Sequence, residues 1–133
     1  MHALNLSLAL LLIPLVAGAG EAPLTGGEFE ARTTGRTMTY AVDGKVYGTE
    51  QYLPGNRVIW AFEGDDCVRG IWEETAGRIC FLYEDDPEPA CWQFFDDGGR
   101  LTARFDGDPE GARLKEVAQS PEPMSCPGPE VGA

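Results

Sequence analysis

Residues 67–95 read CVRGIWEETAGRICFLYEDDPEPACWQFF, and this stretch decides the fold that we predict for the chain. It holds three of the four cysteines and two of the three tryptophans. Segments 78–84 and 90–95 are rich in β-branched and aromatic residues, and the acidic, proline-containing linker between them is typical of a hairpin loop. We therefore expect these two segments to pair as antiparallel strands.

Two cysteines set the register of this hairpin. When Cys80 is placed opposite Cys91, alternate residues along each strand share a face. The cysteines then lie on one face, and five large apolar side chains lie on the other: Ile79, Phe81, Tyr83, Trp92 and Phe94. A slip of one residue would scatter this apolar face. A directly opposed pair also has the separation that a disulfide spans, so we predict a Cys80–Cys91 bridge.

The amino-terminal stretch has the pattern of a secretory signal peptide. Residues 1–19 contain no Asp, Glu, Lys or Arg, residues 4–16 form an apolar run, and Ala17-Gly18-Ala19 is an A-x-A cleavage site. The run is short for a transmembrane anchor, which needs about 20 apolar residues. We expect a periplasmic or secreted protein that begins at Gly20 and has no membrane segment after cleavage.

Export also bears on the remaining cysteines. Four cysteines in an exported chain are typical of two disulfides, and the sequence alone allows three pairings. The Cys80–Cys91 bridge leaves Cys67 to pair with Cys126. No C-x-x-C motif is present and the only histidine, His2, lies in the signal peptide, so structural zinc is disfavoured and we expect neither metal nor cofactor.

The rest of the chain alternates short strand patterns with tight turns. Thr25-Gly26-Gly27-Glu28 is a capping-box pattern that predicts a short helix over 25–33, with an irregular arm as the alternative. Asp43-Gly44 is the strongest short hairpin signal. We expect eight strands at 37–42, 45–53, 57–63, 67–74, 78–84, 90–95, 100–106 and 112–118.

Evenly spaced strands joined by tight turns favour an all-β antiparallel meander that is closed or nearly closed into a small barrel, because closure removes edge strands. A two-sheet sandwich is the alternative. We expect the barrel domain to span residues 20–118 and a Pro/Gly-rich tail, residues 119–133, to be tethered by Cys126. The predicted core contains seven aromatic residues: Trp60, Phe62, Trp72, Phe81, Trp92, Phe94 and Phe105.

The run from Tyr52 to Phe95 resembles small exported proteins of unknown function from alphaproteobacteria. Their recurring pattern is similar to G-x-W, then I/L-C-F/W-x-Y, then C-W. The matching positions here are Gly70, Trp72, Cys80, Phe81, Tyr83, Cys91 and Trp92. The resemblance covers roughly residues 25–129. It implies a periplasmic or secreted β-rich domain and carries no catalytic residue.

Few catalytic groups remain in the predicted mature chain. It has no histidine, its only serines are Ser120 and Ser125, and its cysteines are expected to be oxidised, so Ser-His and Cys-His catalysis is disfavoured. Glu73-Glu74 is the best carboxylate pair for acid–base work, but adjacent strand residues point to opposite faces. Residues 106–111 resemble the start of a calcium loop, yet Val117 stands where the bidentate Glu is required. We expect ordinary acidic surface at both places.

The net charge of −12 limits the classes of partner. Nucleic acid and anionic membranes would be repelled, whereas a cationic partner would be attracted by the field. A soluble acidic protein with no such partner has the same composition. The sequence therefore predicts a non-catalytic, exported binding or inhibitor-like module that recognises a protein, for example a cationic one, or a small ligand. The alternative is a carboxylate-dependent enzyme that acts on cell-envelope glycans.

Overall fold

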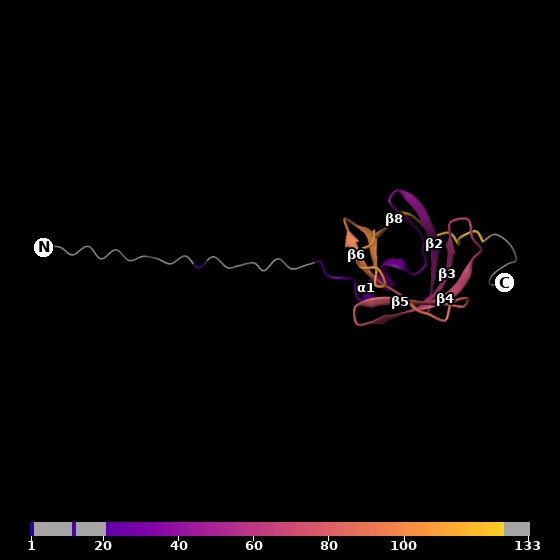
Figure 1. Cartoon of the computed structure of the whole chain (residues 1–133), viewed down its shortest axis with the longest axis horizontal. Helices are drawn as coiled ribbons and strands as arrows, with labels where there is room; N and C mark the ends of the chain where they lie inside the picture. Colours follow the sequence, from indigo (N-terminus) through magenta and orange to yellow (C-terminus); the bar gives the residue numbers. More distant parts are fainter. Residues whose placement is uncertain (2–11, 13–20, 127–133) are drawn as a thin grey trace.

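The computed structural model describes residue 1, residue 12 and residues 21–126. Most of the predicted signal peptide and the last seven residues of the predicted tail lie outside this range. The described chain forms one helix and eight strands (Figure 1). They are α1 (Gly26–Thr33), β1 (Thr37–Val42), β2 (Lys45–Leu53), β3 (Arg57–Phe62), β4 (Val68–Thr75), β5 (Arg78–Tyr83), β6 (Ala90–Asp97), β7 (Arg100–Phe105) and β8 (Leu114–Ser120).

Every strand pairs antiparallel with the next, and β8 returns to pair with β1, so the sheet is a closed barrel. The predicted closed meander is confirmed, and the sandwich alternative is wrong. The last strand begins and ends two residues later than predicted, because a turn carries the chain past Ala112 before pairing starts. Gln119 and Ser120 pair with β1, so the tail after the barrel begins at Pro121, which has no N–H to donate.

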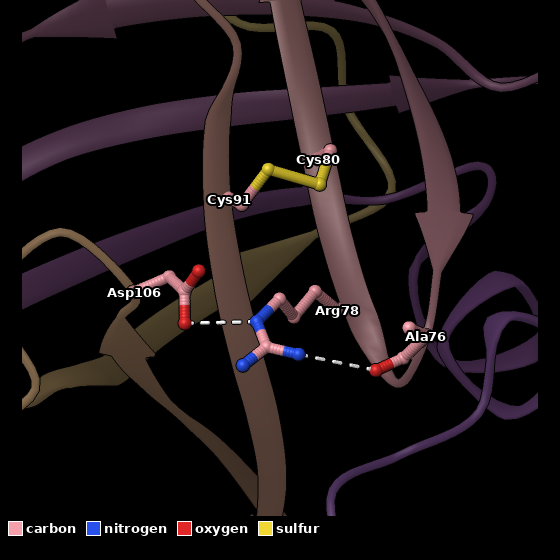
Figure 2. The surroundings of a disulfide bond; sticks show 5 residues. All are labelled: Ala76, Arg78, Cys80, Cys91 and Asp106. Carbon is pink, nitrogen blue, oxygen red and sulfur yellow. Dashed lines mark hydrogen bonds and ion pairs between the residues drawn. A yellow bond between two sulfur atoms is a disulfide. The ribbon is translucent and has the colours of Figure 1, made fainter.

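The predicted hairpin register is confirmed. Cys80 lies opposite Cys91, and Ile79 opposite Trp92. Figure 2 shows the disulfide joining the two neighbouring strands β5 and β6. The second disulfide joins Cys67, just before β4, to Cys126 after β8, with a Cα–Cα distance of 5.6 Å. Both predicted disulfides are therefore present.

Helix α1 closes one end of the barrel. Its amino terminus has the predicted capping box, in which Thr25 Oγ1 accepts from the Glu28 N–H at 3.2 Å and the Glu28 carboxylate accepts from the Thr25 N–H at 3.1 Å. Hydrogen bonds to the Glu28 carboxyl from the Thr25 backbone and from the Thr25 side chain lower the pKa of Glu28. Phe29 on the inner side of α1 is fully buried, and its ring meets the Trp72 ring edge-on at 5.1 Å. The apolar face of an eight-residue helix thus completes the core at this end.

The core matches the predicted aromatic set only in part. Trp60, Trp72, Phe81 and Phe94 are buried, as predicted, and Trp92 is half-buried and packs against the core; its placement in the interior is thus only partly correct. Two predictions were wrong: the side chains of Phe62 and Phe105 are 48% and 37% exposed. Both follow the inward alternation of their strands, but each is the last residue of its strand at the end that α1 does not cover.

Candidate binding site

The end of the barrel opposite α1 contains a cavity of about 80 Å³. Residues of β1, β2, β3, β5, β6 and β8 line it. Aromatic side chains make up most of its wall, among them Tyr47, Trp60, Phe62 and Trp92. The exposure of Phe62, which sequence analysis placed in the core, therefore has a structural explanation: its ring forms part of the mouth of this cavity.

Two glycines let aromatic rings lie directly against the barrel wall. A Cβ on Gly48 would stand 2.5 Å from the Trp60 ring, and a Cβ on Gly70 would stand 2.7 Å from the Tyr83 ring. Real Cβ contacts of this length are essentially absent from proteins. The rings of Trp60 and Tyr83 thus occupy space that any other residue would fill, and both border the cavity.

The cavity also contains a buried carboxyl group. Glu50 points inward from β2 and is only 2% exposed. The Tyr83 hydroxyl donates to Glu50 Oε2 at 2.6 Å, and a second pair of buried hydroxyls, those of Tyr40 and Tyr52, lies 2.8 Å apart. Burial raises the pKa of Glu50 to about 8, against the opposing effect of hydrogen bonds from Tyr83 and Tyr52. At neutral pH this buried carboxyl is therefore mainly protonated.

Acidic turns surround the mouth. Four turns meet at this end, at residues 43–44, 63–67, 84–89 and 106–113. They hold eleven carboxylates and one basic residue, Arg113. The three hairpin turns at the α1 end, at 54–56, 76–77 and 98–99, hold no carboxylate. At this end α1 carries Glu28 and Glu30, and the adjoining strand ends carry Glu73, Glu74, Asp96 and Asp97, so fewer carboxylates lie here than in the four turns at the mouth. The negative field of the chain is therefore concentrated around the open mouth.

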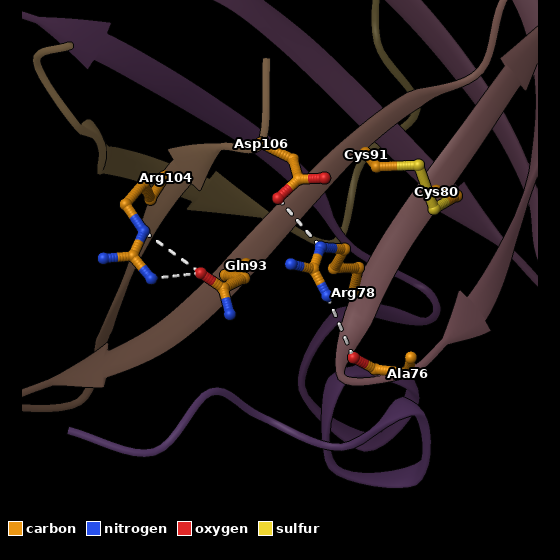
Figure 3. Close-up of polar contacts among 7 residues, drawn as sticks. All are labelled: Ala76, Arg78, Cys80, Cys91, Gln93, Arg104 and Asp106. Carbon is orange, nitrogen blue, oxygen red and sulfur yellow. Dashed lines mark hydrogen bonds and ion pairs between the residues drawn. A yellow bond between two sulfur atoms is a disulfide. The ribbon is translucent and has the colours of Figure 1, made fainter. Parts of the chain in front are cut away.

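One of these turns is tied to the outer wall. Arg78 reaches across β6, and its Nε donates to Asp106 at 2.8 Å, while another guanidinium nitrogen donates to the Ala76 carbonyl at 3.3 Å (Figures 2 and 3). Beside it, the Arg104 guanidinium donates to the side-chain amide oxygen Oε1 of Gln93 (Figure 3). These contacts connect β5, β6 and β7 on the face that carries the Cys80–Cys91 disulfide and fix the start of the 106–113 turn.

The carboxylates singled out from the sequence, at 73–74 and 106–111, do not line the cavity. Glu73 and Glu74 are both exposed, and Glu74 accepts a hydrogen bond from the Gly77 N–H at 3.2 Å. Residues 106–111 resemble the start of a calcium loop, in which Asp106 would be the first ligand. In the structure Asp106 is instead paired with Arg78. Within residues 21–126, no three His, Cys, Asp or Glu side chains gather as a set of metal ligands.

Sequence analysis missed Glu50. The available signal was its position: Gly48, Glu50 and Tyr52 alternate along one strand, so a carboxyl shares a face with an inward tyrosine. Acidic side chains are usually at the surface, and the sequence has 22 of them. Only closure of the barrel shows that this one is inside.

A broader depression of about 1100 Å³ lies on the outer face of β2–β5, beside the segment that contains Met124 and Cys126. Ile71 and Leu82 are both 43% exposed and form part of its floor. It is larger than the cavity in the barrel. However, Glu50 lies inside the barrel and not on this face, so we regard the barrel cavity as the candidate site.

Comparisons of the chain with protein-family models, curated proteins and solved structures found no match. Among the described residues, no helix is both long and apolar enough to cross a membrane. The two disulfides are compatible with export, since such bonds persist mainly in oxidising compartments.

Proposed function

We propose that the protein is an exported, non-catalytic binding module that receives a cationic partner at the open mouth of its barrel. The observation that carries this proposal is the contrast between the two ends. One end is filled by α1, whereas the other has an aromatic-lined cavity beneath acidic turns. Clefts lined by one sign of charge attract partners of the opposite sign and raise their association rates.

The signal-peptide pattern and the two disulfides support the exported location. Mass spectrometry of the exported protein tests this part directly. We expect a mature amino terminus at Gly20 or within a residue or two of it. A protein that retains Met1 or Ala3 after fractionation would contradict export through signal cleavage.

The alternative, an enzyme that acts on glycans, receives less support from the geometry. Glycosidases hold two carboxyl groups about 5–9.5 Å apart on either side of the sugar. Here Glu50 borders the cavity, but the second inward-facing buried carboxylate, Glu116, accepts from the Leu101 N–H at 3.2 Å and is not part of the cavity wall. A cavity of about 80 Å³ is also far below the roughly 300–1,000 Å³ of ordinary small-molecule sites.

Binding to a basic protein tests the proposal. The mature chain is immobilised, and a basic lysozyme or protease is passed over it at increasing salt. We expect affinity to fall with salt because the steering charges are exposed. The double variant Asp66→Asn/Asp85→Asn, in two mouth turns, should bind more slowly than the matched control Glu30→Gln/Asp97→Asn at the α1 end. Equal effects of the two variants, or no binding to any cationic partner, would refute the assignment to the mouth.

A further inference from the structure

We propose that the cavity in the barrel is a binding site for an alkylammonium group, whose positive nitrogen contacts Glu50 while the surrounding aromatic rings enclose its carbon chain. This inference rests on the proposed function and specifies the chemistry that the mouth would recognise. Three features carry it: the size of the cavity, the arrangement of its rings and the position of the buried carboxyl.

The size of the cavity restricts the occupant to a small group. About 80 Å³ is enough for a head group and a short chain but not for a sugar ring or a drug-sized molecule. The remainder of any larger ligand must therefore lie in the mouth, among the acidic turns. A free amine and the side chain of a lysine on a protein partner both satisfy this condition.

Three rings form a corner of the cavity. The centroids of Tyr47 and Phe62 are 5.3 Å apart, as are those of Trp60 and Phe62, and their planes meet at 76° and 85°. Tyr47 and Trp60 are 5.8 Å apart with planes at 46°. Rings that are steeply inclined to one another present both faces and edges to the same small volume. Such a corner packs against several methylene groups of one alkyl chain, and the electron-rich ring faces favour a chain that carries a positive charge.

Glu50 supplies the charge. It is held from β5 by the Tyr83 hydroxyl, and the Tyr40 and Tyr52 hydroxyls from β1 and β2 complete its polar surroundings. Glu116 on β8 also acts on this group of tyrosines, through its charge near Tyr40. An ammonium ion stabilises the carboxylate form, so its entry releases the proton of Glu50 to solvent and leaves one buried ion pair.

The test uses n-butylammonium as the cationic probe and n-butanol as a neutral probe of the same shape. Binding is followed by the fluorescence of Trp60 and Trp92, which both border the cavity. We expect n-butylammonium to bind more tightly than n-butanol, and its affinity to rise with pH up to about 8, the pKa of Glu50. Calorimetry in buffers of different ionisation enthalpy should detect about one proton released at pH 6.

The variant Glu50→Gln keeps an oxygen that can accept from Tyr83 and removes the charge. We expect it to bind n-butylammonium about tenfold or more weakly, as for the loss of a charge-assisted hydrogen bond, with n-butanol unchanged. Glu73→Gln, exposed on β4, is the matched control and should bind as the wild type does. The wild-type pH profile and proton count keep the test decisive if the variant does not fold.

A tripeptide with a central lysine distinguishes the two sources of the ammonium group, a protein side chain and a small free amine. The same peptide with norleucine in place of lysine is its control. Preference for the lysine peptide over the free amine assigns the site to a protein partner, and the reverse assigns it to a small amine. Equal affinity for n-butanol and n-butylammonium, or no binding of the ammonium probe, overturns the site. If the site is overturned but a basic protein still binds more slowly to the Asp66→Asn/Asp85→Asn variant, the proposed function stands without the alkylammonium site.

Discussion

Replacing Phe29 by Ala is expected to undo the closure of the barrel at the α1 end. The Phe29 side chain is fully buried, and its ring centroid lies 4.5 Å from that of Phe94, 5.1 Å from that of Trp72 and 5.6 Å from that of Tyr52. Phe29 is the only aromatic residue in α1, and it is the only residue of α1 in the hydrophobic core cluster. Most of the apolar contact between helix and barrel is therefore made by one side chain.

The expected magnitude follows from these contacts. Truncating a buried Phe to Ala costs about 3–5 kcal/mol of unfolding free energy, through lost burial and the cavity that remains. The edge-to-face contacts with Trp72 and Tyr52 add to the burial term and place the cost in the upper part of this range. A helix of eight residues is also too short to persist alone, since isolated helices need about 12–15 residues. Loss of docking should therefore unfold α1.

Urea unfolding with disulfides intact measures this effect. We expect a lower midpoint for Phe29→Ala and a fall in melting temperature of about 12 °C or more, at roughly 4–8 °C per kcal/mol for a domain of about 100 residues. Phe62→Ala is the control, because that side chain is 48% exposed, and it should cost about 1 kcal/mol or less. Equal costs for the two variants, or a Phe29→Ala protein as stable as the wild type, would refute the role given to Phe29 in docking α1 against the barrel.

Three further predictions concern the cavity and the disulfides. Burial raises the pKa of Glu50 to about 8, so between about pH 4.5 and 8 the folded state binds more protons than the unfolded state. Stability should therefore fall as pH rises through this window. In thermal unfolding, Glu50→Gln should abolish this dependence of the melting temperature on pH. Gly48→Ala places a Cβ 2.5 Å from the Trp60 ring and 2.6 Å from the Ala61 carbonyl oxygen, so it should cost about 1–3 kcal/mol and alter tryptophan fluorescence. Unchanged values would show that the ring and the neighbouring strand both shift freely. Cys126→Ser opens a loop of sequence separation 59 and Cys80→Ser one of 11, so the chain-entropy model gives losses of about 4 and 3 kcal/mol. Limited proteolysis should cut the tail of the Cys126 variant first and the central hairpin of the Cys80 variant first.

Local features of the sequence determined much of the fold. Asp43 and Gly44 both have positive φ, as the predicted two-residue turn requires, and the Thr25 capping box starts the helix where expected. The register of Cys80 against Cys91 could be deduced because it places five large apolar side chains of that hairpin on one face and sets the two cysteines opposite each other on the other face. These features depend on neighbours within a hairpin or a helical turn, so the sequence contains the information needed to predict them.

The tertiary structure alone decided how deep each inward residue lies. Alternation along a strand predicts which face a side chain occupies, but not whether something covers the end of the barrel. Phe81 and Phe62 both point inward; Phe81 is buried in the layer above α1, whereas Phe62 stands at the uncovered mouth and is half-exposed. Glu50 shows the converse, because an acidic residue that composition assigns to the surface is enclosed once β8 pairs with β1. Burial, and with it the raised pKa and the cavity, arises from contacts between strands that are distant in sequence, and no local pattern encodes them.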